Sequence, residues 1–209
     1  ENRPIMRGLS SPYGLSYTPG MWLNSIQVSK GVASVTAGHE AITGQINLEH
    51  RKPPDEERLF VNFYLDDELR PEINLSSALP LTADKRLSTV ILFHGSADTD
   101  VREMDHNHDS FRDQPETNLL SLSNRWLYQT TSGAQLRWGF KLLQENRLGG
   151  MMEYEDDDRA LMAKGWNWAE TGDEMPAYGS HIRNREAGAY FKMGMPLGAA
   201  VYNPDEQEE

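Results

Sequence analysis

The chain has 209 residues, and its 20 Lys and Arg against 32 Asp and Glu leave a formal net charge of −12. A surface that follows nucleic-acid phosphates would need the opposite sign, so the composition predicts no nucleic-acid partner. The absence of cysteine excludes disulfides, thiol nucleophiles and Cys-ligated metal centres. No run reaches the roughly 18 to 20 consecutive apolar residues of a membrane-spanning helix, a test that strands with one lipid-facing side escape.

The opening of the chain predicts ordered loop and two short strands. Proline and glycine are dense in residues 1–20, which excludes a long helix there. Short strands are expected at 21–28 and 46–50, separated by the small, glycine-containing segment 31–44.

A charged linker at 51–58, containing Pro53 and Pro54, marks a boundary in the chain. We therefore expect two units, residues 1–53 and residues 54–209.

Beyond the linker, apolar and polar residues alternate with a period of two, which is typical of strands with one apolar face. In the clearest run, the residues expected to share the apolar face are Ala134, Leu136, Trp138, Phe140 and Leu142. Strands are predicted at 59–65, 72–81, 87–95, 118–130, 134–142 and 182–195. Short connections favour an antiparallel meander, so the predicted fold class is all-β.

The predicted connections alternate in length. Short turns contrast with two long acidic loops, 97–116 and 146–180, as in outer-membrane barrels. A soluble antiparallel sandwich remains an alternative, because its half-buried strands alternate in the same way. The two differ in whether the apolar face meets lipid or packs beneath a second layer.

Two motifs near the start carry the most specific signal. They are Trp22–Gly31 (WLNSIQVSKG), followed by Ser34-Val35, and then Gly38–Leu48 (GHEAITGQINL). Their order and spacing resemble the end of the plug domain of TonB-dependent outer-membrane receptors, and Gly14–Gly20 and Leu59–Asn62 are similar to the same family. The chain departs from many relatives at Lys30-Gly31-Val32, where they have Arg-Gly-Pro, and at Gly44-Gln45, where they have Gly-Gly.

The resemblance implies a segment of a transmembrane antiparallel β-barrel preceded by the end of a plug domain. Residues 1–53 would be the C-terminal part of the plug, and residues 54–209 the first six or so strands with long acidic loops. A complete wall of roughly 22 strands would need a longer protein. The expected location is the outer membrane of a Gram-negative bacterium.

The implied function is active uptake of a scarce ligand: a metal chelate, a vitamin or a glycan. The implied partners are a TonB-type energising protein, whose contact box is absent from this sequence, outer-membrane lipid, and as a further candidate a surface lipoprotein. Such a receptor is not an enzyme and requires no cofactor. The ligand itself is not identified by the sequence.

A second constellation has the spacing of a calcium loop. Oxygen donors fall at positions 1, 3, 5, 7, 9 and 12 of a 12-residue stretch, with a backbone carbonyl at position 7. These residues are Asp105, Asn107, Asp109, Phe111, Asp113 and Glu116. Ser110 replaces the glycine of position 6 and Pro115 restricts the approach to Glu116, which weaken the match. A solvated acidic loop or a softer metal on His106 and His108 are the alternatives.

Two other functions stay open at this stage. One is a soluble, calcium-stabilised β-sheet module that binds carbohydrate. The other is an enzyme on a β-scaffold that uses two acidic residues, although no defined catalytic set is present. Separately, Trp166, Trp168 and Tyr178 are candidates for stacking on a sugar or a siderophore ring, with plain packing of the loop as the alternative.

Overall fold

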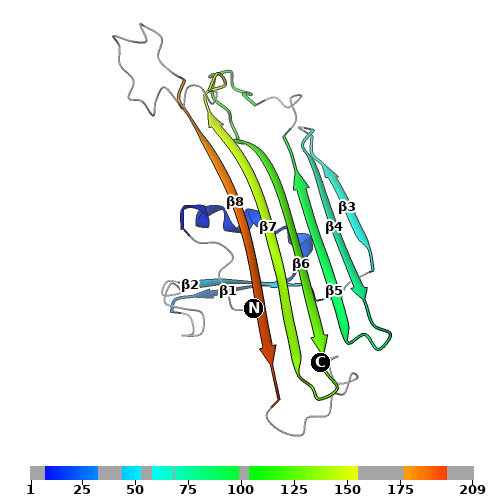
Figure 1. The fold of residues 1–209 in the computed structure, drawn as a ribbon. Helices are drawn as coiled ribbons and strands as arrows, with labels where there is room; N and C mark the ends of the chain where they lie inside the picture. The colour runs from blue at the N-terminus through cyan, green and yellow to red at the C-terminus, as the bar shows by residue number, and fades with distance from the viewer. Residues whose placement is uncertain are drawn as a thin grey trace.

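The computed structural model describes residues 8–32, 44–52, 58–67, 69–98, 104–154 and 177–196. A small antiparallel sheet pairs β1 (Leu23–Lys30) with β2 (Gly44–His50). A large antiparallel sheet contains six strands in chain order (Figure 1). They are β3 (Phe60–Leu65), β4 (Pro71–Pro80), β5 (Leu87–Ser96), β6 (Glu116–Gln129), β7 (Gln135–Gly150) and β8 (Gly179–Gly194). Two 3-10 helices, η1 (Gly8–Tyr17) and η2 (Gly20–Trp22), precede β1.

The prediction of an all-β, antiparallel fold is confirmed. Strands occur at each of the predicted places, and each strand of the large sheet pairs with its neighbour in the chain. The tight turn between β6 and β7 depends on Gly133, whose φ of 81° is left-handed backbone that favours glycine. The sheet is open, because within the described ranges β3 and β8 each pair on one side only. No helix in those ranges is long and apolar enough to cross a membrane.

β7 and β8 extend further than the sequence predicted. The expected loop at 146–180 is wrong at both ends, because β7 continues to Gly150 and β8 begins at Gly179. The apolar alternation stops at Leu142, whereas the backbone ladder continues through pairs such as Asn146 with Arg183. Hydrogen bonding thus extends the strands beyond the part that the hydrophobic pattern marks.

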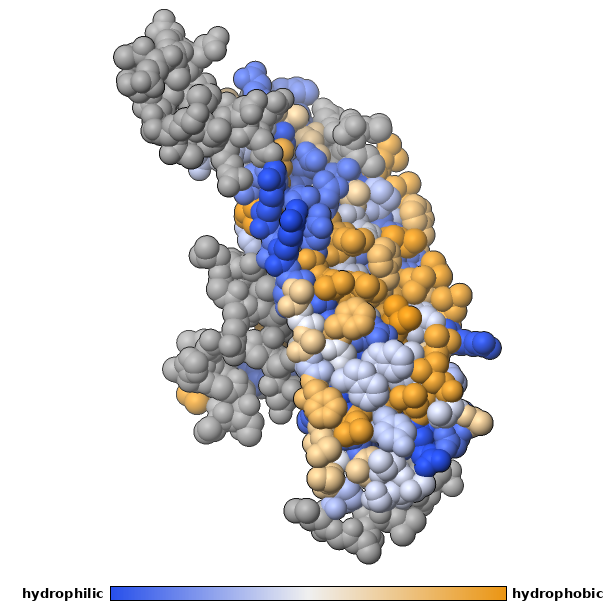
Figure 2. All heavy atoms as spheres, in the orientation of Figure 1, coloured by the Kyte–Doolittle hydropathy of each residue, from blue (hydrophilic) through white to orange (hydrophobic). Residues whose placement is uncertain are grey.

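The large sheet has one covered and one uncovered face. The N-terminal segment, residues 8–32 and 44–52, lies against one face, which we call the inner face; the opposite one is the outer face. The strands pass in front of the N-terminal segment in Figure 1, so Figure 2 shows the outer face. Buried polar residues of the inner face include Asn74, Ser76, His94, Ser121, Lys141 and Glu145. Exposed apolar residues of the outer face include Val61, Phe63, Ile73, Leu120, Phe140, Leu142, Phe191 and Met193.

Two small apolar clusters join the N-terminal segment to the inner face. Trp22 packs on Ala78, Val90 and Leu92, with Met21 beside it. Tyr17 packs on Leu119 and Leu143, with Tyr13 beside it. The described core is therefore confined to patches on an otherwise polar surface.

Candidate functional site

The most tightly bonded part of the junction between the N-terminal segment and the inner face is centred on Tyr17. Its side chain is fully buried, and its hydroxyl donates a hydrogen bond to the carboxylate of Glu145, also fully buried. The side-chain amide of Asn184 donates to the Tyr17 oxygen over 3.1 Å. Contacts from η1, β7 and β8 therefore meet at one phenol.

Arg147 compensates the buried carboxylate. Its Nη2 lies 2.8 Å and its Nε 3.1 Å from Glu145 Oε1. The two residues are two positions apart on β7, so both side chains point to the inner face. The Arg147 guanidinium also lies 4.5 Å from the centre of the Tyr13 ring, a cation–π contact with the N-terminal segment. We call Tyr13, Tyr17, Glu145, Arg147 and Asn184 the tyrosine latch.

Burial and the hydrogen bond to Glu145 raise the pKa of Tyr17 to about 12. Burial has the larger effect, because phenolate loses more solvation free energy than phenol on leaving water. The phenol is therefore neutral at physiological pH and acts as the donor to Glu145. The bond depends on this protonation state, because phenolate beside carboxylate would place two negative charges together.

A second attachment uses backbone atoms. The Arg51 amide donates to the Trp22 carbonyl over 3.0 Å. The Arg51 carbonyl in turn accepts a 2.8 Å hydrogen bond from Nη1 of Arg125 on β6. This arrangement positions the Trp22 cluster beside the end of β2.

A polar cleft lies between the N-terminal segment and the inner face. It has a volume of about 490 Å³, and Pro19 and Gly20 line one side. Glu72 and His94 line the other side, where His94 Nδ1 lies 2.9 Å from Asn74 Oδ1. The cleft offers hydrogen-bonding groups to water or to a small polar ligand.

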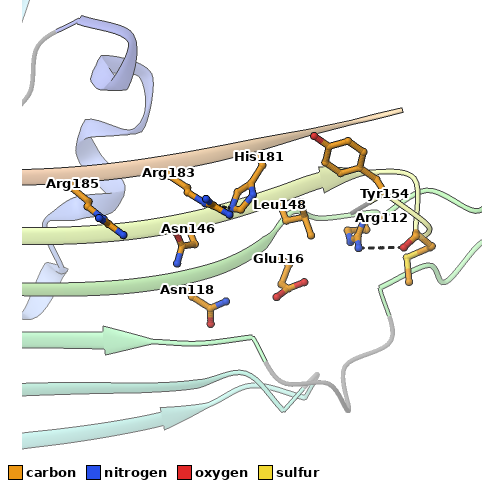
Figure 3. A pocket seen from close by; sticks show the side chains of 10 residues that line it. Arg112, Glu116, Asn118, Asn146, Leu148, Tyr154, His181, Arg183 and Arg185 are labelled. Carbon is orange, nitrogen blue, oxygen red and sulfur yellow. Dashed lines mark hydrogen bonds between the residues drawn. The ribbon is translucent and has the colours of Figure 1, made fainter. Parts of the chain in front are cut away.

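A second hollow, of about 570 Å³, opens on the outer face (Figure 3). β8 contributes His181, Arg183 and Arg185, and β7 contributes Asn146. Arg112, which precedes β6, closes one end. The basic side chains of this hollow contrast with the acidic composition of the whole chain.

The donors predicted for calcium are folded into local turns. Asp105 accepts hydrogen bonds from the backbone amides of Asp109 and Ser110 over 3.1 and 2.8 Å. Asn107 Oδ1 accepts from the Asp109 amide over 3.0 Å, and Asp109 Oδ1 accepts from the Phe111 amide over 2.9 Å. Ser110 has a φ of 68°, which is the left-handed conformation that glycine adopts most easily.

The last two predicted calcium donors are not part of this network. Asp113 accepts a 2.8 Å hydrogen bond from the His106 amide. Glu116 is the first residue of β6 and lines the outer-face hollow. In the described part of the chain, no group of three or more His, Cys, Asp or Glu is arranged to hold a metal ion. Calcium binding at this loop remains a prediction.

Some predicted features lie outside the described residues. These are the motif portion within 33–43 and the side chains of Trp166 and Trp168. Tyr178 is described and is 67% exposed.

The sequence reasoning missed the tyrosine latch. Glu145 and Arg147 stand on the polar side of an alternating strand, and their spacing of two residues was a usable signal for an inner-face pair. Tyr17 lies 128 residues away from Glu145, and nothing in the local pattern links them.

The chain matched no protein-family model, no curated protein and no solved structure. Functional conclusions therefore depend on the geometry of its two faces.

Proposed function

We propose that this chain is the plug end and first wall strands of a TonB-dependent outer-membrane transporter that takes up a scarce ligand. The observation that carries the proposal is the polarity of the large sheet: its covered face is polar and its uncovered face is apolar. A soluble sheet has the reverse arrangement, because burial of apolar surface stabilises it in water.

The apolar outer face is too continuous to be scattered surface residues. It runs across all six strands, from Val61 and Phe63 on β3 to Phe191 and Met193 on β8 (Figure 2). Moving one such side chain from water to hydrocarbon gains about 1.5 to 3 kcal/mol, and lipid would supply that gain over the whole face. None of the described residues covers it with a second layer.

The orientation of the apolar band supports tilted membrane strands. Phe63, at one edge of the sheet, is in register with Arg185 at the other, through Ile73, Gly95, Leu120 and Gln144. A row here is a line of outer-face partner residues that crosses all six strands. At the β3 edge the apolar band reaches Leu65, which is one row nearer the long connections than Phe63. At the β8 edge it reaches only Ala187, which is one row nearer the short turns than Arg185. This offset of roughly 13 Å over roughly 24 Å of sheet width gives a tilt of about 30°, near the 35 to 45° of outer-membrane strands.

The depth of the band is also consistent with a bilayer. On β8 and the residue after it, the outer-face apolar positions run from Ala187 to Met195, a span of roughly 27 Å along the strand. Corrected for a tilt of about 30°, this is about 23 Å, close to the roughly 25 Å of an outer-membrane apolar band.

Aromatic residues lie in the half of the band nearer the short turns, from its central row onward. Trp126 and Trp138 are paired across β6 and β7 and stack with ring centres 5.7 Å apart and planes 8° apart. Tyr128 is in the next row toward the turn. Trp and Tyr are enriched at membrane–water interfaces, because their rings are apolar and their N–H or O–H groups are polar.

The N-terminal segment fits the role of a plug. It contacts a polar wall through two small apolar clusters and a few hydrogen bonds, including those of Tyr17 and Arg125. Attachments of this kind hold a segment in place and permit its release without unfolding the wall.

The open edges of the sheet favour additional strands. β8 extends over Gly179–Gly194, and a long unpaired edge is a site of unwanted strand pairing that native proteins cover or close. A transporter wall would pair β3 and β8 with further strands and enclose the N-terminal segment.

Site-directed labelling tests the proposal, and the cysteine-free sequence provides a clean background. Leu122 on the outer face and Ser123 on the inner face are adjacent on β6. In protein reconstituted into lipid vesicles, an environment-sensitive fluorophore on Leu122→Cys should be quenched by nitroxide lipids, whereas the same label on Ser123→Cys should not. Equal and weak quenching at both positions would favour the soluble-module alternative.

A further inference from the structure

The outer-face hollow lies where the apolar band ends. On β8, Arg183 and Arg185 are exposed and share the outer face with Ala187. Arg185 is paired with Gln144, and the next row toward the short turns pairs Ala187 with Leu142. The distance along β8 from Arg185 to Ala187 is therefore two residues, or roughly 7 Å, and it separates a cationic row from the apolar band.

The hollow is basic in an acidic protein. The chain has a net charge of −12, yet three arginines and one histidine line the hollow against a single carboxylate, that of Glu116. Chance placement of surface charge in such a chain favours the opposite sign. The local excess of positive charge indicates an anionic partner.

The cationic groups are held in place. Arg112 donates from Nη1 to the Met151 carbonyl and from Nη2 to the Met152 carbonyl, the latter over 3.3 Å (Figure 3). Arg183 Nε lies 3.3 Å from His181 Nε2, which orients the guanidinium along β8. Asn118 and Asn146, a directly opposed pair on β6 and β7, add amide donors beside the two arginines.

We propose that this hollow binds the phosphate group of a membrane lipid whose acyl chains lie on the apolar band. This inference rests on the proposed function, because it requires the outer face to meet lipid. Arginine binds phosphate through two parallel N–H groups, and Arg183 and Arg185 are exposed on the face that carries the apolar band. An amphiphile matches both parts of the surface at once, whereas a free anion matches only the hollow.

The membrane leaflet concerned is the one on the side of the long connections. Both the connection from β5 to β6 and that from β7 to β8 leave the sheet at the end that carries the hollow (Figure 1). A lipid held there would fix the depth of β8 in the bilayer.

Native mass spectrometry of the full chain in dodecyl maltoside micelles provides the test. Dimyristoyl phosphatidic acid is titrated against dimyristoyl phosphatidylcholine, and inorganic phosphate is added as a competitor. The wild type should bind phosphatidic acid more tightly than phosphatidylcholine. In the double variant Arg183→Gln/Arg185→Gln, the ratio of the two affinities should fall about fivefold for each arginine, and so about twenty-five-fold in total.

The matched control is Arg137→Gln/Lys192→Gln. These residues are paired across the same two strands, but they lie on the inner face near the opposite end. This control removes the same charge and should keep the wild-type preference.

Each remaining outcome has a separate meaning. An unchanged preference in Arg183→Gln/Arg185→Gln, or displacement of the lipid by millimolar inorganic phosphate, would overturn the lipid site and leave the transporter proposal intact. Failure of the wild type to take up either lipid would count against the proposed function itself, and with it against this inference.

Discussion

Neighbouring residues on β7 show how differently the two faces of the large sheet are constructed. Glu145 is fully buried and bonded to Tyr17 and Arg147, whereas Phe140 and Leu142 are 41% and 47% exposed. On the inner face, polar groups are satisfied by partners from the N-terminal segment. On the outer face, no second layer of described residues covers the apolar side chains, so their free energy depends on the medium that surrounds the sheet.

Alternation alone does not define which side of a strand is buried in the folded protein. A two-residue period indicates that a strand has one polar and one apolar side. Which of the two sides is buried depends on what lies against the sheet, and in this chain the N-terminal segment lies against the polar side. Substitutions that act on one face only can therefore test the assignment of the two faces.

The largest effect is expected from Glu145→Ala on the inner face. It leaves Tyr17 without its acceptor and Arg147 without its carboxylate, and breaking a buried ionic contact costs about 3 to 5 kcal/mol. Guanidinium unfolding of the protein in lipid vesicles measures the loss. Gln144→Ala, on the outer face of the same strand, should stay within about 0.5 kcal/mol. Equal effects of the two substitutions would contradict the latch.

Next in size is Phe191→Arg on the outer face. If this face meets lipid, an arginine at the middle of the Ala187–Met195 span of the band should destabilise the folded protein by about 2 to 4 kcal/mol in vesicles. Phe191→Met keeps the apolar character and should cost less than about 1.5 kcal/mol. A near-neutral Phe191→Arg, measured by the same unfolding titration, would mean that water contacts this face.

A smaller effect is expected from crowding the inner face at Gly139. A Cβ built there lies 2.4 Å from the Asn124 carbonyl oxygen, which belongs to the paired strand and cannot move freely. Gly139→Ala should therefore cost about 1 to 3 kcal/mol. Gly95→Ala on the outer face is the control, since its Cβ would lie 3.5 Å from Ile73, an ordinary contact. Thermal unfolding of both variants measures the difference.

The smallest effect concerns the protonation of Tyr17. Its pKa is raised to about 12, so the folded state holds the proton more tightly than the unfolded chain, whose tyrosine titrates near 10. The stabilisation is fully present below about pH 10 and is lost as the pH rises through about 12. Proteolysis of the N-terminal segment should therefore accelerate over this range in the wild type.

Tyr17→Phe provides the matched comparison for that pH dependence. It keeps the ring in its cluster with Leu119 and Leu143 and removes only the hydroxyl. At neutral pH, attachment of the N-terminal segment should be about 1 kcal/mol less stable in this variant. Its proteolysis should show no acceleration that depends on ionisation of the Tyr17 hydroxyl. An identical pH profile for the two proteins would show that the phenol does not control attachment.

Much of the fold was accessible from the sequence, since strand pairing in a meander is local. The runs around Phe63, Ile73 and Trp138 alternated clearly, and each became a strand at the predicted place. The end of β7 was predicted too early. Beyond Leu142 the outer-face residues become polar, and the backbone ladder rather than hydrophobicity sustains the strand.

The candidate sites were less accessible. The tyrosine latch joins Tyr17 to residues more than a hundred positions later, and no periodicity encodes such a contact. The outer-face hollow was also missed, because Arg183 and Arg185 become a cluster with Arg112 only when β8 pairs with β7 and the connection before β6 folds over it. The calcium spacing was visible, but spacing does not fix where each oxygen points.

The sequence by itself determined that this chain forms successive antiparallel strands with one polar and one apolar side. That information is local, because a two-residue period acts within each strand and short turns join most neighbours. Only the tertiary structure decided that the N-terminal segment covers the polar side. The reason is that this choice depends on contacts such as those of Tyr17 and Trp22, whose partners are distant in the chain and close only after folding.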